Sequence, residues 1–204
     1  MLILSICETD GNSENMLAWS SEDKGDLISL NGHCIKHLGK EGEKKSSIIR
    51  TTKPIDSSIQ VYYYELTVLQ PGEKCIIGIG LTKSNVTNNT GQLMPGWYGD
   101  SIGYHGDDGG LFHNRSIGPA GSYSPYSTGD TVGCCLKQIS IGNKMHQLCF
   151  FTLNGKKISG DRLLKNGNFF PTIGLGYGGA EVETNLGHKA FLFDLKSTLE
   201  EKIG

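Results

Sequence analysis

Short segments with alternating apolar and polar residues dominate the sequence after residue 26. The segment 60–69 is the clearest case, because its alternate positions are large and apolar and would share one face of an extended strand. These positions are Tyr62, Tyr64, Leu66 and Val68. Further strands are predicted at 27–30, 33–38, 47–52, 75–82, 101–105, 111–113, 131–139, 148–153, 169–175, 180–186 and 191–193. Many short strands with almost no helix predict an all-β fold in which two sheets pack as a sandwich.

Turn sequences separate the predicted strands. Asn31-Gly32 and Asn154-Gly155 each join two of them, and both residue types tolerate the positive φ angles that a two-residue hairpin needs. Glycine accounts for 29 of the 204 residues and is scattered between apolar segments. The glycines therefore indicate turns and bulges, and not a flexible linker.

The chain is predicted to hold one domain with two short flanking parts. Residues 1–26 are polar and acidic with no sustained period, and we expect an extension packed on the domain. The sandwich itself is expected at 27–194. Residues 195–204 are expected to form a short C-terminal helix or tail, with Ser197 as its N-cap and Glu200 as the capping-box partner.

Charge and cysteine content narrow the class of protein. The formal net charge is −2, which gives no general attraction to nucleic acid or to an anionic membrane. The apolar segment 2–6 is too short for a signal peptide or a membrane span. The six cysteines show no C-x-x-C spacing, so we expect reduced thiols and a cytoplasmic or nuclear protein.

Two groups of residues could suggest chemistry. The segment 174–179 fits the G-x-G-x-x-G pattern of a nucleotide-binding loop, but residues 180–186 alternate like a strand and do not provide the helix N-terminus that binds phosphate. His105, Asp107, Asp108 and His113 could form a metal site or an acid–base pair, but polar residues of a hairpin turn explain them equally well. No G-x-S-x-G elbow is present. We therefore expect no enzyme activity, no cofactor and no metal.

An ordered series of motifs resembles the SPRY family, also called B30.2/SPRY. The motifs are Tyr63-Tyr64-Glu65-Leu66, Ile77-Gly78-Ile79-Gly80-Leu81, Pro95-Gly96-Trp97, the segment 101–109, Gly129-Asp130-Thr131-Val132-Gly133-Cys134, Phe151-Thr152-Leu153-Asn154-Gly155 and Phe170-Pro171-Thr172-Ile173-Gly174. The similarity is greatest to the branch that includes Ran-binding protein M. It implies a concanavalin-like antiparallel jelly roll that acts as a protein-interaction module.

The resemblance also implies a binding surface made of loops between strands. The long polar loop at 83–100 is a candidate on its own, because long loops in compact domains are commonly functional. The aromatic residue in the glycine-rich bend at 176–179 would be a protein-contact anchor. The predicted partner-binding residues are Arg50, Ser84, Asn88, Leu93, Met94, Tyr177 and Gly178. We expect a monomer that binds a short peptide segment of a partner protein; the alternative is a carbohydrate-binding, lectin-like sandwich, which a glycan array would reveal.

Overall fold

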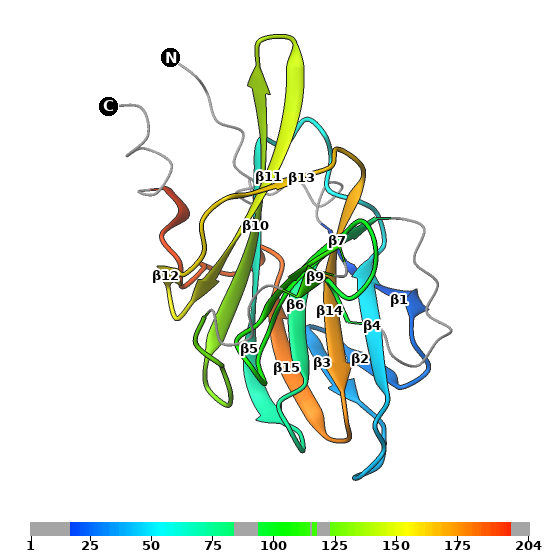
Figure 1. The fold of residues 1–204 in the computed structure, drawn as a ribbon. Helices are drawn as coiled ribbons and strands as arrows, with labels where there is room; N and C mark the ends of the chain where they lie inside the picture. The colour runs from blue at the N-terminus through cyan, green and yellow to red at the C-terminus, as the bar shows by residue number, and fades with distance from the viewer. Residues whose placement is uncertain (1–16, 84–93, 115, 118–122, 197–204) are drawn as a thin grey trace.

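Two antiparallel sheets pack face to face in the computed structural model, which describes residues 17–83, 94–114, 116–117 and 123–196 (Figure 1). The seven-strand sheet has the order β1 (Trp19–Lys24), β4 (Ser46–Thr51), β14 (Phe169–Gly176), β6 (Ile77–Lys83), β7 (Ser101–His105), β8 (Leu111–His113) and β9 (Ser116–Ile117). The eight-strand sheet has the order β12 (Lys156–Lys157), β11 (Lys144–Leu153), β10 (Thr131–Ile141), β5 (Val61–Pro71), β15 (Ala180–Asn185), β3 (Cys34–His37) and β2 (Ile28–Asn31), with β13 (Arg162–Leu164) also paired to β11. This architecture confirms the predicted sandwich.

The core between the sheets contains the alternating residues of β5. Tyr62, Tyr64, Leu66 and Val68 are all at most 1% exposed and belong to one apolar cluster. The Tyr64 hydroxyl crosses to the opposite sheet, where it donates to the carbonyl of Gly80 at 2.6 Å and accepts the N–H of Gly80 at 3.1 Å. A buried hydroxyl needs such partners, so this residue links the two sheets by hydrogen bonds as well as by packing.

The outer face of the eight-strand sheet carries a second apolar cluster. Tyr63 of β5 points to this face, and Phe150 of β11 lies beside it. The C-terminal segment covers both through Phe193 and Leu195. The predicted strand at 191–193 is wrong, because the Leu192 N–H bonds to the Glu65 carboxylate and not to a neighbouring strand.

The two flanking parts of the chain differ from expectation in detail. Residues 19–24, predicted to lie in a packed extension, form β1 at the edge of the seven-strand sheet. The Trp19 indole N–H donates to Thr184 Oγ1 of the other sheet at 2.7 Å, which fixes this strand to the core. At the other end only Leu195 and Lys196 are described as helical. Residues 1–16 and 197–204, including the predicted N-cap, lie outside the described residues.

The Asn154-Gly155 turn forms as predicted, with φ 49° and 73°, the positive angles that this turn type requires. The other hairpin turns one residue later than predicted: Asn31 is the last residue of β2 and pairs with Cys34, so Gly32, with φ 59°, and His33 form the turn. The β10–β11 hairpin is longer than predicted, because it continues to Ile141 and resumes at Lys144. It projects beyond the rest of the sheet at the top of Figure 1.

The described cysteines are free thiols. Cys134 lies in the inner core and Cys135 in the outer cluster, as expected for adjacent residues of one strand. None of the helical residues that the structure describes forms a helix long and apolar enough to cross a membrane.

Candidate functional site

The bend after β14 holds Tyr177 in an unusual backbone conformation. Its φ is 56°, in the left-handed region that bulky residues rarely adopt. The Tyr177 N–H donates to the carbonyl of Lys45 at 3.0 Å, and the preceding Gly176 N–H donates to Ile76 at 2.7 Å. The ring is partly exposed and lies 5.9 Å from the Lys74 ammonium. Main-chain bonds to two other segments therefore fix an aromatic side chain at the surface.

Gly178 lies directly against the loop that follows β3. A Cβ atom at this position would be 2.5 Å from the carbonyl oxygen of Gly39 and 2.7 Å from the carbonyl carbon of Lys40. His37 is buried beneath the same loop. Burial lowers the pKa of His37, although the Glu43 carboxylate and the main chain of Tyr177 oppose this effect. The imidazole is therefore neutral at pH 7 and supports the loop.

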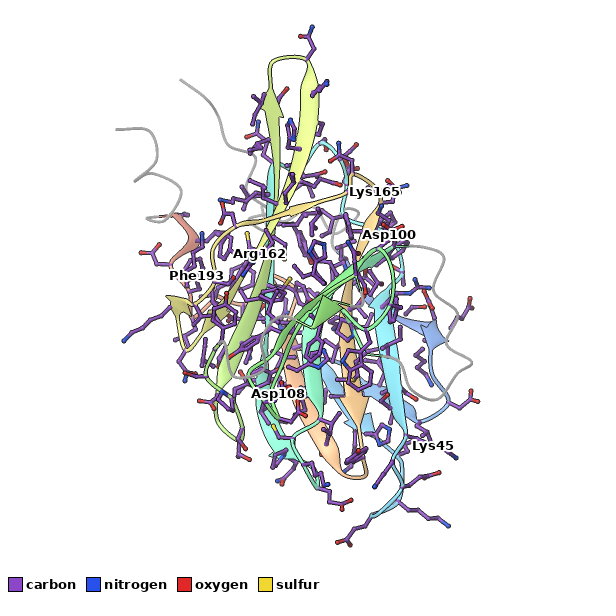
Figure 2. The ribbon with its side chains drawn as sticks, viewed as in Figure 1. Lys45, Asp100, Asp108, Arg162, Lys165 and Phe193 are labelled. Carbon is purple, nitrogen blue, oxygen red and sulfur yellow. The ribbon has the colours of Figure 1, made fainter. Side chains whose placement is uncertain are left out.

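Arg50 lies at the other end of the seven-strand sheet from this bend. It is 5% exposed, and its guanidinium pairs with Asp23 at 2.6 Å and donates to the carbonyl of Lys83 at 2.8 Å. The bend contacts the chain at Lys45, just before β4. Arg50 is five residues further along this strand, a distance of about 17 Å. Figure 2 shows the two ends through Lys45 and Asp100. The structure thus separates Arg50 from Tyr177, and its side chain is engaged inside the protein.

Met94 is also buried, although it was predicted to contact a partner. It is 0% exposed and covers the outer face of the seven-strand sheet, where added Cβ atoms on Gly78 and Gly174 would be 2.9 Å and 2.6 Å from its side chain. The two glycines leave room for this thioether. The remaining predicted contacts, Ser84, Asn88 and Leu93, lie outside the described residues.

A small pocket accompanies the connection after β4. It has a volume of about 110 Å³, and its lining includes Lys53, Asp56 and Ser58. The pocket lies at that end of the sheet and is separate from the Tyr177 bend.

Trp97, which was not among the predicted partner contacts, is exposed at the surface. Its side chain is 41% exposed, with its ring 5.5 Å from His105 and 6.3 Å from Phe112. Gly96 before it has φ 94° and would clash with Phe112 if it carried a Cβ atom. The Pro-Gly pair before the tryptophan is therefore the signal of a tight turn that presents this ring at the surface.

The histidine and aspartate group at 105–113 is structural. Burial lowers the pKa of His105 to about 4, and its Nε2 donates to the carbonyl of Pro95 at 2.8 Å. Asp108 accepts the N–H of Gly110 at 2.7 Å within the turn. Among the described residues, no three His, Cys, Asp or Glu side chains gather in a way that could hold a metal ion.

The G-x-G-x-x-G segment has no phosphate-binding context. Gly174 and Gly176 belong to β14, and the next element is strand β15. A helix N-terminus is the group that would bind a phosphate in such a loop. The strand predicted after this segment is confirmed.

These observations define an antiparallel β-sandwich whose connecting segments form its distinctive surfaces. The family model of the SPRY domain matches residues 61–189. The chain belongs to the SPRY family, whose domains generally act as protein–protein interaction modules. The resemblance seen in the motifs is confirmed.

Curated relatives carry the names of Ran-binding proteins. The chain is 35% identical over 188 residues to Ran-binding protein 9 of Danio rerio, covering 90% of this chain and 30% of that protein. It is 36% identical over 181 residues to the Ran-binding proteins 9/10 homolog of Drosophila melanogaster, covering 86% and 18%. The Ran-binding protein M homolog of Arabidopsis thaliana is 34% identical over 150 residues, covering 73% and 30%. The chain thus spans less than a third of the length of these relatives.

Solved structures support the fold. A human SPRY domain superposes with a TM-score of 0.66 at 23% identity, covering 85% of this chain and 99% of that one. The SPRY domain of human HERC1 gives a TM-score of 0.61 at 14% identity, covering 85% and 100%.

Proposed function

We propose that the chain is a non-catalytic interaction module that binds a segment of a partner protein at the sandwich end carrying the Tyr177 bend. The observation behind this proposal is the backbone of Tyr177, a large and partly exposed residue held at φ 56°. Such conformations are unfavourable by about 1–3 kcal/mol and gather at functional sites. Membership of an interaction family supports the same assignment.

The bend is suited to bind a peptide without rearranging. Hydrogen bonds from Tyr177 to Lys45 and from Gly176 to Ile76 hold its main chain on both sides. A surface fixed in advance loses little conformational entropy when a ligand binds. The tyrosine ring adds a large contact area with few rotatable bonds, and the nearby Lys74 adds a positive charge.

The other predicted residues take different parts in this proposal. Gly178 allows the bend to lie against the loop at Gly39. Ser84, Asn88 and Leu93 remain proposed partner contacts, but the connection that carries them leaves β6 at Lys83, beside Arg50 and away from the bend. Arg50 and Met94 are not proposed as contacts, because both are buried.

Peptide selection tests the Tyr177 site directly. A phage library of random 12-residue peptides is selected on the immobilised protein, and enriched peptides are measured by fluorescence polarisation. We expect Tyr177→Ala and Tyr177→Gly to weaken binding at least tenfold, while Leu192→Ala, which truncates a side chain that is 57% exposed near Gly155, changes nothing.

The glycine variant separates a lost contact from a folding defect. Glycine has no Cβ atom and accepts a positive φ, so Tyr177→Gly should be about 1 kcal/mol more stable than Tyr177→Ala. Both variants lack the ring and should bind equally weakly. Peptides that bind both variants as tightly as the original protein would refute the site.

We further propose that the module acts as a monomer in the cytoplasm or nucleus. The free thiols Cys34, Cys75, Cys134, Cys135 and Cys149 support a reducing compartment. Light scattering should give the mass of one copy, 22.1 kDa, and a dimer mass would contradict this expectation.

A further inference from the structure

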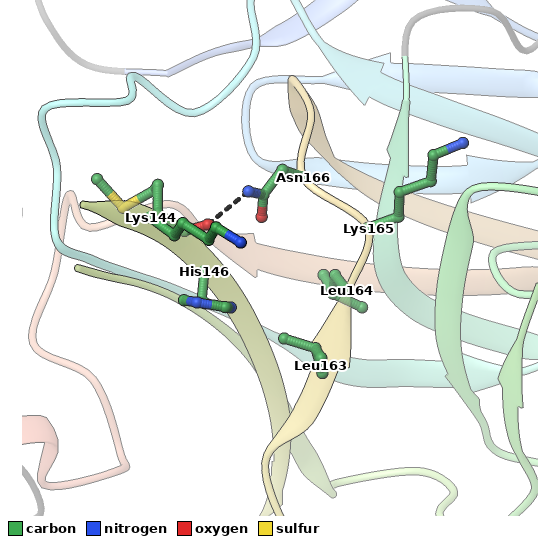
Figure 3. A pocket seen from close by; sticks show the side chains of 7 residues that line it. Lys144, His146, Leu163, Leu164, Lys165 and Asn166 are labelled. Atoms are coloured by element: carbon green, nitrogen blue, oxygen red, sulfur yellow. Dashed lines mark hydrogen bonds between the residues drawn. The ribbon is translucent and has the colours of Figure 1, made fainter. Parts of the chain in front are cut away.

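The β10–β11 hairpin forms one wall of a groove at the far end of the eight-strand sheet. The other wall is the segment 163–166, which begins in β13, the short strand that pairs with β11 (Figure 3). The groove has a volume of about 470 Å³ and is open to solvent. We call it the hairpin groove.

Side-chain amides hold the two walls together. The Gln147 amide donates to the carbonyl of Gly167 at 3.0 Å and accepts the Gly167 N–H at 2.7 Å. Asn166 Nδ2 donates to the carbonyl of Met145 at 2.5 Å, the bond drawn in Figure 3. The groove is therefore a formed feature of the fold and not a gap between unconnected loops.

Apolar side chains are exposed around this groove. Ile141, Met145 and Leu163 are 62%, 45% and 60% exposed, and they are three of the seven large apolar side chains exposed in the described part of the chain. The register places Ile141 and Leu163 on one face of the hairpin and Met145 on the other. Met145 and Leu163 both line the groove, and Ile141 lies at the hairpin tip outside its lining. Exposed apolar groups that gather in this way indicate a contact surface.

The same region is strongly basic in a chain that is acidic overall. Residues 137–166, from β10 to the end of the groove wall, contain six Lys and Arg residues and a single acidic residue, whereas the whole chain carries a net charge of −2. That acidic residue, Asp161, pairs with Lys137 and Lys157. Lys144 and Lys165 line the hairpin groove and form no ion pair with any residue that the structure describes. Their positive charge is available to a partner.

We propose that the hairpin groove is a second docking surface that binds an acidic, apolar-containing segment of a partner protein. Met145 and Leu163 receive the apolar side chains of that segment. Lys144 and Lys165 attract its carboxylates. The proposal does not depend on the Tyr177 site, because Lys165 and Lys45 lie at opposite ends of the molecule (Figure 2).

A designed peptide tests this surface. The probe is a fluorescent 12-residue peptide in which Asp and Glu alternate with Leu and Phe, and binding is measured by fluorescence anisotropy. We expect Lys144→Glu combined with Lys165→Glu to weaken binding at least tenfold, and Leu163→Ser to weaken it several-fold. Raising the salt from 50 mM to 500 mM should also weaken it, because exposed charges are screened.

Matched controls make the outcome decisive. Lys40→Glu with Lys44→Glu gives the same change in net charge near the Tyr177 bend and should leave binding unchanged, as should Tyr177→Ala. A peptide with Lys in place of Asp and Glu should not bind. Equal binding by the two double variants would overturn the proposal. So would a 12-nucleotide single-stranded DNA that displaces the peptide and binds more tightly, since the occupant would then be nucleic acid.

Discussion

The two ends of the sandwich form their surfaces by different means. At the Tyr177 bend the main chain fixes the shape, through the hydrogen bond to Lys45 and the contact of Gly178 with Gly39. At the hairpin groove side chains fix it, through the amide of Gln147 and the amide of Asn166. The first surface offers one strained aromatic residue, and the second offers exposed apolar and basic groups.

This difference determines how each surface responds to substitution. A shape held by close backbone contacts tolerates no added atoms, so changes there alter folding and binding together. Exposed side chains on a formed groove can change with little effect on stability. We therefore expect substitutions to be tolerated less well at the bend than at the groove.

Acidification should produce the largest difference between the two ends. Burial lowers the pKa of His105 to about 4 from the ordinary 6.5, and burial also lowers the pKa of His37. His105 pairs with Gly78 near the start of β6, beside the bend. In the unfolded chain His105 takes up a proton below pH 6.5, whereas in the folded chain it does so only near pH 4. The folded state therefore loses stability as the pH falls between these values. His105 alone should account for about 2–3 kcal/mol between pH 7 and 4.5, as measured by urea unfolding.

The variant His105→Gln separates this contribution from others. Its amide can still donate to the carbonyl of Pro95 but does not titrate in this range. We expect its stability to fall by about 2–3 kcal/mol less than that of the original protein over the same pH change. An unchanged pH dependence would mean that other groups control the acid response.

A single methyl group at Gly178 should have the next largest effect. The Cβ atom of Gly178→Ala would lie 2.5 Å from the Gly39 carbonyl oxygen, which is backbone and cannot turn away. We expect a loss of about 2 kcal/mol in unfolding free energy, together with weaker binding of peptides selected on the bend. Gly160→Ala is the control, because nothing lies within 4 Å of its added Cβ atom. Equal stability of the two variants would show that the loop at residue 39 yields easily.

Loss of the Gln147 side-chain amide at the hairpin groove should have the smallest effect on the free energy of unfolding. Gln147→Ala removes the bonds to Gly167 and leaves Gln138 Oε1 without its donor. We expect about 1–2 kcal/mol of destabilisation and weaker binding of the acidic peptide, with peptide binding at the bend unchanged. Gln70→Ala, on an exposed position of β5, should be neutral. Weakened binding at both surfaces would show that they are not independent.

Local patterns predicted much of this architecture. Asn154-Gly155 specifies its turn through backbone preference alone, and the alternation in β5 identifies its buried face. The Asn31-Gly32 pair predicted a hairpin at the right place, but the turn residues are Gly32 and His33. The tip of the long hairpin was missed, because Ile141, Lys144 and Met145 are all exposed and no face alternates in burial. A strand that buries neither face lacks the period-two signal.

The candidate site was harder to predict than the fold. Tyr177 was predicted to be a contact because its glycine neighbours leave it uncovered, and the structure shows it partly exposed. Arg50 was not recognised as buried, because Asp23 and Lys83 satisfy its guanidinium only after the strands assemble. Met94 was predicted to be a contact because it lies in the loop before β7, but its burial depends on room left by Gly78 and by Gly174, which is 80 residues away in the sequence. Such long-range pairings are set by tertiary structure and leave no local pattern.

The apolar cover on the outer face of the eight-strand sheet affects how this domain can be divided. Phe193 and Leu195 shield Tyr63 and Phe150, yet they follow residue 189, where the family signature ends. A recombinant fragment trimmed at that signature would expose an aromatic patch and tend to self-associate. The smallest soluble unit therefore extends past the region by which the family is recognised.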